Sequence, residues 1–277
     1  MTTITASVVN KLRQMTGAGM MDCKKALQEA EGDIDAAIDI LRKSGAAKAA
    51  KRADRDAAEG LSIAKSSADN TYGIVVEVNC ETDFVAKNDD FVAFANKIAD
   101  IALDQKFADR DALLATPFDG KTLGEILVDK TAVIGEKIDV SNYALVSSEG
   151  VAAYNHGANR IGVLVALNSN EESALQAGRD LAMQIAAMNP IAVDETSVSQ
   201  EVKDKELEIG RDIARQEGKP EEMLDKIAQG KLQRFYKDST LMHQAFVKDS
   251  SMTVAAFLKT VDANLIVKSF TRFQLGA

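Results

Sequence analysis

The sequence predicts an α+β protein with an N-terminal three-helix module, a duplicated α+β core of two small antiparallel sheets with helices, and an inserted antiparallel helical hairpin. Apolar residues recur at helical spacing through the first 45 residues, with glycines where the helices should end. A strand, turn, strand, helix pattern occurs twice, about 90 residues apart. A later helical stretch is polar over most of its surface. At 277 residues, the chain is long enough for about two domains.

Composition excludes several classes of function. The chain carries 42 acidic residues against 33 Lys and Arg, a net charge of −9, which disfavours broad nucleic-acid binding. Two His and two Cys, far apart in sequence, do not suit a zinc site or a disulfide framework, so no metal or cofactor is expected. No apolar leader or membrane-length segment is visible, and the expected location is the cytoplasm.

Residues 1–45 predict the three-helix module. Thr5, Asp22 and Asp33 are expected to cap the helices, and the glycines around position 18, Gly32 and Ser44-Gly45 are expected to end them. Met20 and Met21 are adjacent and cannot both face a small core. We therefore expect one of them to be an exposed, adaptable contact for a partner.

Residues 46–56 predict a basic linker. The stretch from Arg42 to Arg55 contains six basic residues and one acid, a local charge of +5. Two interpretations remain open. The segment is either a solvated helical linker or a basic handle for an acidic surface of a partner.

The core is predicted to divide into a first half, residues 57–143, and a second half, residues 144–277. Glu59-Gly60 corresponds to Glu149-Gly150, and each half continues into a β-rich run and then a helix, over 91–103 and 172–188. A strand over 266–273 should complete the second sheet, with 144–146 at its edge. Thr122 to Glu125 has the spacing of a capping box.

Residues 197–236 predict the hairpin. Ser197 is expected to cap its first helix, and Gly218-Lys219-Pro220 separates that helix from the second. The apolar stripes are narrow, so the helices should pack mainly on each other. The expected stripe residues are Val202, Leu207, Ile209 and Ile213, then Leu224, Ile227 and Phe235. A projecting arm and an ordinary surface decoration are both consistent with this pattern.

The loop after the first copy's strands is the strongest functional candidate. It reads Asn79 to Asn88 and contains Phe84, whereas the matching loop of the second copy has no aromatic residue. Strand-to-helix loops often carry function. Phe84 beside Asp83 is consistent with an aromatic side chain that docks into another protein. The same sequence is also consistent with Thr82 or Asp83 as a helix N-cap and Phe84 packed underneath it.

Two segments resemble signatures of the elongation factor Ts family: residues 12–27 and residues 77–87. Residues 154–162 are similar to that family's signature in the second half. The order of the parts agrees as well, over nearly the whole chain. The resemblance implies a ubiquitin-associated-like N-terminal module and a guanine-nucleotide exchange factor of translation elongation, not an enzyme. Its partner would be elongation factor Tu, both GDP-bound and nucleotide-free.

The resemblance also implies roles for particular residues. Thr82, Asp83, Phe84 and Val85 would intrude near the partner's magnesium and loosen GDP. Leu12, Arg13, Met20 and Met21 would contact the partner from the N-terminal module, and His156 would contact it from the second half of the core. Many relatives continue past the last strand into a C-terminal helix that touches the partner, and that contact is not expected here.

An alternative function belongs to another class. A ubiquitin-associated-like module on a duplicated scaffold also suits an adaptor or a nascent-chain interaction protein without exchange activity. A 2:2 complex with the partner and a homodimer both remain open.

Overall fold

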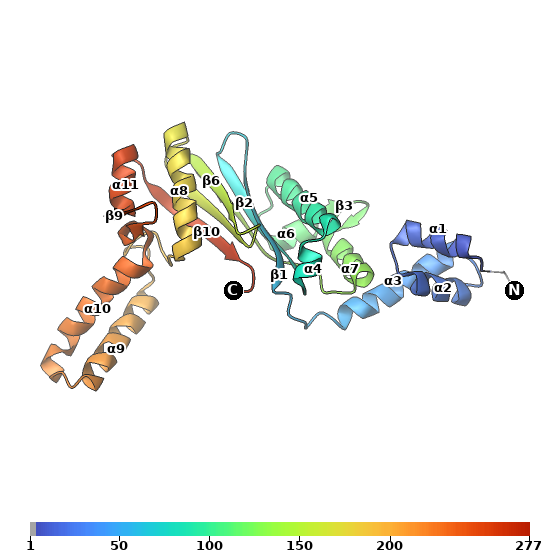
Figure 1. The fold of residues 1–277 in the computed structure, drawn as a ribbon, viewed down its shortest axis with the longest axis horizontal. Coiled ribbons are helices and arrows are strands. Elements are labelled where there is room, and N and C mark those ends of the chain that lie inside the picture. The colour runs from blue at the N-terminus through green and yellow to red at the C-terminus, as the bar shows by residue number, and fades with distance from the viewer. Residues whose placement is uncertain (1–3) are drawn as a thin grey trace. The chain divides into compact units, whose positions relative to one another are not determined.

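The computed structural model describes residues 4–277 (Figure 1). The chain divides into two compact units. The first consists of Met1–Ser62, Val76–Ala144 and Gln274–Ala277, and the second of Ile63–Val75 and Leu145–Phe273. The fold is mixed α and β, with small sheets and N-terminal helices, as the sequence predicts.

Three helices form the N-terminal module: α1 (Ala6–Thr16), α2 (Met20–Glu29) and α3 (Ile34–Ala50). The predicted caps at Thr5 and Asp33 are confirmed, because each side chain accepts a backbone N–H of the first turn. The module has its own apolar core, built from Val9, Leu12, Cys23, Ala26, Leu27 and Ala37.

Two predicted helix ends in this module are wrong. Helix α2 begins at Met20 instead of after Asp22, and its N-cap, Gly19, offers no side chain. Asp22 instead pairs with Lys48, 2.9 Å away. Helix α3 continues through Gly45, because that glycine serves close packing and not a helix end. A Cβ there would lie 2.9 Å from the Cβ of Ala132 on α7 (Leu123–Ile134).

The first half of the core is a three-stranded sheet with helices. Its strands are β1 (Glu59–Ser66), β2 (Tyr72–Cys80) and β5 (Asp139–Ser147), in the order β1-β2-β5. The intervening elements are α4 (Asp83–Ala86), α5 (Asp89–Gln105), α6 (Arg110–Leu114), the hairpin of β3 (Pro117–Phe118) and β4 (Lys121–Thr122), and α7. The predicted capping box of Thr122 and Glu125 is confirmed at the start of α7.

The second half repeats this arrangement. Its strands are β6 (Gly150–His156), β7 (Ile161–Leu167) and β10 (Val267–Gln274), in the order β10-β7-β6. Strands β6 and β7 are antiparallel, with Gly150 opposite Leu167 and His156 opposite Ile161. In each sheet the second strand of the copy lies in the centre. The other elements are α8 (Glu172–Met188), β8 (Ala245–Phe246), β9 (Asp249–Thr253) and α11 (Val254–Val261).

The third strand of each sheet shows that one strand prediction is wrong and another is right. Residues 144–146 belong to β5 and complete the first sheet, so they do not extend the second one. Strand β10 completes the second sheet, as predicted. The paired glycines confirm the correspondence between the copies. A Cβ at Gly60 would lie 2.1 Å from the carbonyl oxygen of Val78, and one at Gly150 would lie 2.0 Å from that of Ser169.

The hairpin consists of α9 (Gln200–Gln216), the 3₁₀ turn η1 (Glu221–Met223) and α10 (Leu224–Ser239), with a second 3₁₀ turn, η2 (Leu241–His243), behind it. Helices α9 and α10 lie side by side (Figure 1). Ser199 is the N-cap of α9, not Ser197, whose hydroxyl donates to Asp194. Ile209 and Ile213 are exposed, whereas Gly210 and Ala214 are buried and Gly210 lies directly against Ala228 of α10.

The close approach of α3 and α7 gives a stability prediction. Gly45→Leu forces a large side chain into this contact and should lower the free energy of unfolding by about 1–3 kcal/mol. Gly230→Leu on α10 is the matched control, because nothing lies within 4 Å of a Cβ at that position. The control should gain about 0.5–1 kcal/mol from helix propensity. Urea denaturation followed by circular dichroism checks both, and equal effects would contradict the packing role of Gly45.

Candidate partner-binding site

The candidate loop is a short helix directly after the central strand of the first sheet. Thr82 is the N-cap of α4, and its hydroxyl oxygen accepts the N–H of Val85 at 3.4 Å. Phe84, on the first turn, is 83% exposed, more than any other large apolar side chain within residues 4–277. The interpretation that Phe84 packs underneath the cap is therefore wrong. An apolar ring held in water next to a helix start suits a contact with another molecule.

The loop is anchored by a carboxylate from another part of the same unit. Glu136, in the turn between α7 and β5, accepts the Thr82 N–H at 3.0 Å and the Thr82 hydroxyl at 2.7 Å. Asn88 caps the following helix, α5, and accepts the N–H groups of Asp90 and Phe91. The backbone on both sides of Phe84 is therefore fixed while its ring remains exposed.

Charges around the loop are paired locally. Asp83 binds Lys87 at 2.6 Å, one helical turn away. The hydrogen bond and charge of Lys87 hold the pKa of the Asp83 carboxyl below its usual range, so Asp83 is ionised at neutral pH. Burial, together with the nearby Glu136, raises the pKa of the Cys80 thiol to about 12. Cys80 therefore stays protonated, and its thiol donates to the carbonyl of Thr82.

The candidates in the N-terminal module separate by exposure. Arg13 is exposed, Met20 is 50% exposed and Met21 is 63% exposed. Both methionines are thus available, although the sequence predicts only one. Leu12 is fully buried in the core of the module. It supports the fold of the module and offers no surface for a direct contact.

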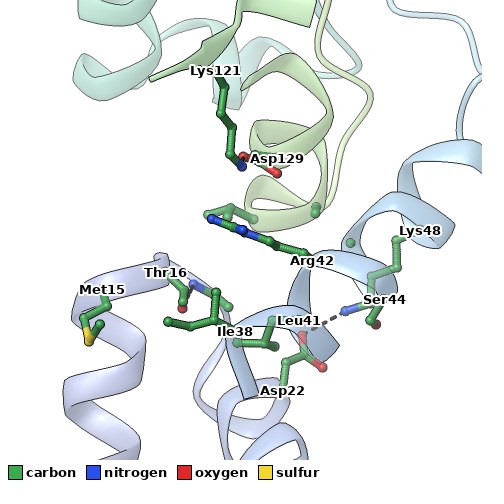
Figure 2. Close-up of a pocket in the computed structure, with 14 residues that line it drawn as sticks. Met15, Thr16, Asp22, Ile38, Leu41, Arg42, Ser44, Lys48, Lys121 and Asp129 are labelled. Atoms are coloured by element: carbon green, nitrogen blue, oxygen red, sulfur yellow. Dashed lines mark hydrogen bonds and ion pairs between the residues drawn. The ribbon is translucent and has the colours of Figure 1, made fainter. Parts of the chain in front are cut away.

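A cavity of about 340 Å³ lies between α3 and α7 within the same unit (Figure 2). Its apolar lining includes Ile38, Leu41 and Val133. Lys121 and Asp129 point toward one another on its α7 side, and the Arg42 side chain extends across it from α3. Met20 and Met21 do not line this cavity. The exposed side chains of Met20 and Met21, which we call the methionine surface, therefore lie outside this cavity.

His156 lies at the end of β6 in the second unit. Its Nδ1 lies 2.9 Å from the hydroxyl of Tyr154, and the imidazole is exposed. The next three residues, Gly157, Ala158 and Asn159, all have positive φ, between 54° and 65°. His156 therefore lies at the last pair of the β6–β7 hairpin, directly before its turn, with its side chain exposed.

No metal centre or membrane span emerges from the described part of the chain. Residues 4–277 contain no group of three or more His, Cys, Asp or Glu side chains placed to hold a metal ion. None of the helices in that range combines the length and the apolar character that crossing a bilayer requires.

A comparison with known proteins decides the family. A family model described as "Elongation factor TS" matches residues 81–277. The chain is 52% identical over 276 residues to the elongation factor Ts of Christiangramia forsetii, with 100% of both chains covered. It is 50% identical to that of Flavobacterium psychrophilum, again over 100% of both, and 50% identical to that of Amoebophilus asiaticus, over 99% of each. The chain belongs to the elongation factor Ts family.

Membership in the elongation factor Ts family makes this chain a translation elongation factor. The match to the family model begins at Glu81, so Thr82, Asp83, Phe84 and Val85 lie inside the matched region.

The structure adds residues that sequence reasoning missed. Glu136 holds the loop at Thr82, and Arg52 and Arg55 hold it at the preceding residue, Glu81. Thr82 and Glu136 are 54 residues apart, and no local pattern links them. For Arg52 and Arg55, the sequence offers one signal, the basic stretch from Arg42 to Arg55. Its composition does not show which residue the arginines bind.

The double anchoring of Thr82 gives a second prediction. Thr82→Ala removes a helix cap and leaves the Glu136 carboxylate without a hydroxyl donor, and should cost about 2–3 kcal/mol of unfolding free energy. Thr253→Ala is the control, because Thr253 caps α11 through the Ala256 N–H alone. That control should lose only about 1 kcal/mol. Denaturant titration measures both, and equal losses would show that the bond between the Thr82 hydroxyl and Glu136 contributes nothing.

Proposed function

We propose that this elongation factor Ts family member is a guanine-nucleotide exchange factor that binds elongation factor Tu with GDP and accelerates GDP release. The observation that carries the proposal is the exposed ring of Phe84 on an anchored backbone. Such a side chain is ready to enter another protein without a prior rearrangement of its own loop. Thr82, Asp83 and Val85 form the rest of the inserting segment.

The energies involved are of matching size. Burying a Phe side chain contributes about 1.5–3 kcal/mol. A coupling free energy of about 1–3 kcal/mol between two sites is typical of allosteric linkage. If the loop enters the nucleotide-free partner better than the GDP-bound one, reciprocity requires that GDP is weakened by the same factor. One inserted aromatic ring is therefore enough to account for a substantial acceleration.

The disturbed group is proposed to be the magnesium and phosphate site of the partner. Magnesium requires near-octahedral oxygen coordination, so small displacements of its surroundings weaken it. Asp83 carries a negative charge next to Phe84 and adds to that disturbance. The exchange makes and breaks no covalent bond, so this chain acts without a cofactor and is not an enzyme in the chemical sense.

Other surfaces would supply affinity. Arg13, Met20 and Met21 are proposed to hold the partner from the N-terminal module, and His156 from the second half of the core. The proposed location is the cytoplasm, where translation takes place.

The release of fluorescent GDP from elongation factor Tu tests the proposal. Phe84→Ala should slow the accelerated release roughly tenfold to thirtyfold, from the loss of about 2 kcal/mol of burial. Ile266→Ala is the control, because Ile266 is 57% exposed and aliphatic, and lies outside the loop. It should leave the rate unchanged.

Two outcomes would contradict the proposal at different levels. No acceleration by the intact chain would reject the exchange function, and binding without release would instead support an adaptor. Full acceleration by Phe84→Ala would reject the loop assignment alone.

The methionine surface predicts a different kinetic signature. The double change Met20→Ala with Met21→Ala should raise the half-maximal concentration of the factor roughly threefold to tenfold, because apolar contact area is lost. The maximal rate should not change, since the inserting loop is intact. Met188→Ala, an exposed methionine of α8, is the control. A lower maximal rate in the Met20 and Met21 variant would show that the module does more than bind.

A further inference from the structure

We infer that Arg52 and Arg55 are positioning residues that fix the Phe84 loop through Glu81 and so tie the N-terminal module to that loop. The effect on GDP release rests on the proposed function, whereas the positioning itself is a property of this chain. Composition marks the basic stretch as a linker or as a handle for another protein. Its arginines instead bind Glu81, a residue of the same unit.

The geometry places both arginines on one side of the chain. After α3 ends, the backbone continues in tight turns, with the Arg55 N–H donating to the Arg52 carbonyl at 3.0 Å. Residues three apart in such turns face the same way. Arg52 binds one oxygen of the Glu81 carboxylate at 2.9 Å, and Arg55 binds the other at 2.8 Å.

A second connection holds the same segment from the turn before β5. The Lys137 N–H donates to Glu81 at 2.7 Å. The Lys137 ammonium donates to the carbonyl oxygens of Ala53 at 2.7 Å and Arg55 at 3.1 Å. Glu136, the adjacent residue, holds Thr82. The segment after α3, the turn at 136–137 and the start of the loop thus form one bonded cluster.

This cluster leads directly to Phe84. Glu81 precedes Thr82, which caps α4, and Phe84 lies two residues beyond the cap. Helix α3 also packs against α7 through Gly45 and Ala132. A partner that binds the N-terminal module therefore acts on a body whose last turns are bonded to the base of the inserting loop.

The charge balance shows why the arginines matter. The Glu81 side chain is only 15% exposed. Burial alone would raise the pKa of the Glu81 carboxyl, but the Lys137 N–H and the Arg55 and Arg52 guanidinium groups outweigh it and hold the pKa below its ordinary value. Without both arginines, a mostly buried carboxylate keeps a single backbone donor. Breaking a pair of this kind costs more than breaking an exposed one.

A matched pair of double variants of the full chain tests the inference. Arg52→Ala with Arg55→Ala removes two positive charges and both contacts with Glu81. Lys43→Ala with Lys51→Ala removes two positive charges from the same stretch, and neither lysine makes an ion pair among residues 4–277. A loss caused only by weaker long-range attraction to an acidic partner would affect both variants equally.

The first measurement needs no partner. Hydrogen exchange of the Lys137 amide and the amides of residues 85–88 should become roughly threefold to tenfold faster in the arginine variant, since part of their anchoring is lost. The lysine variant should match the parent chain. Arg52→Lys with Arg55→Lys should restore slow exchange in part, because ammonium groups keep the charge but not the planar fork.

The second measurement follows GDP release. The arginine variant should lower the maximal accelerated rate roughly threefold to tenfold and change the half-maximal concentration less than about twofold. Glu81→Gln should give the same signature. Combining it with the arginine changes should add nothing, because all act through one contact.

The outcomes separate the two proposals. Unchanged hydrogen exchange in the arginine variant, equal effects in the lysine variant, or additive effects with Glu81→Gln would each overturn the positioning role. If the parent chain fails to accelerate GDP release, the proposed function fails, while the hydrogen-exchange result still decides the positioning. If the arginine variant does not fold, Glu81→Gln, which leaves both arginines in place, decides it alone.

Discussion

The bond between Glu136 and Thr82 is the contact on which the exposed loop depends. Helix α4 has four residues, and isolated helices shorter than about 12 residues are marginal in water. Its direction therefore has to come from contacts outside the helix. Glu136 supplies them by accepting both the amide and the hydroxyl of the N-cap residue, which leaves Phe84 free of any packing role. The ring remains exposed because the backbone beneath it does not need it.

The two halves of the core differ in the loop that follows the central strand of each sheet. Both sheets have their second strand in the centre, and both place a glycine against the backbone at the end of that strand. In the first copy the following loop forms α4 and exposes Phe84. In the second copy, Asn168 stands at the start of the matching loop. Its side-chain amide donates to the carbonyl of Asn264, and its side-chain oxygen accepts the N–H of Ile266, just before β10. One scaffold thus carries one loop tied to its own sheet and one loop turned outward.

The helix caps show how far the sequence could predict this structure. Thr5, Asp33 and Thr122 are predicted correctly because a cap is decided within four residues of the chain. Gly45 is misread as a helix end because its reason lies on α7, 87 residues away in Ala132.

The candidate site has the same limit. The sequence around Phe84 is compatible with a buried or an exposed ring, and Glu136, which anchors the exposed arrangement, is 54 residues away from Thr82. Leu12 belongs to a matching signature, yet its helix turns it into the core. Motifs therefore identify the right segments, whereas the direction of each side chain depends on contacts that are distant in sequence.

The charge of the basic stretch illustrates the consequence for function. Of its six basic residues, Lys48 pairs with Asp22, and Arg52 and Arg55 pair with Glu81. Half of these basic residues are thus paired inside this chain, and the two carboxylates they share offset two of the six positive charges. Partly buried pairs are also screened by salt less than exposed charges are. The exposed apolar side chains of the N-terminal module, Met20 and Met21, do not depend on this charge, while Arg52 and Arg55 bond the segment after α3 to Glu81 at the base of the loop. Under the proposed function, binding through the methionines and insertion of Phe84 would therefore be carried by different side chains of one bonded unit.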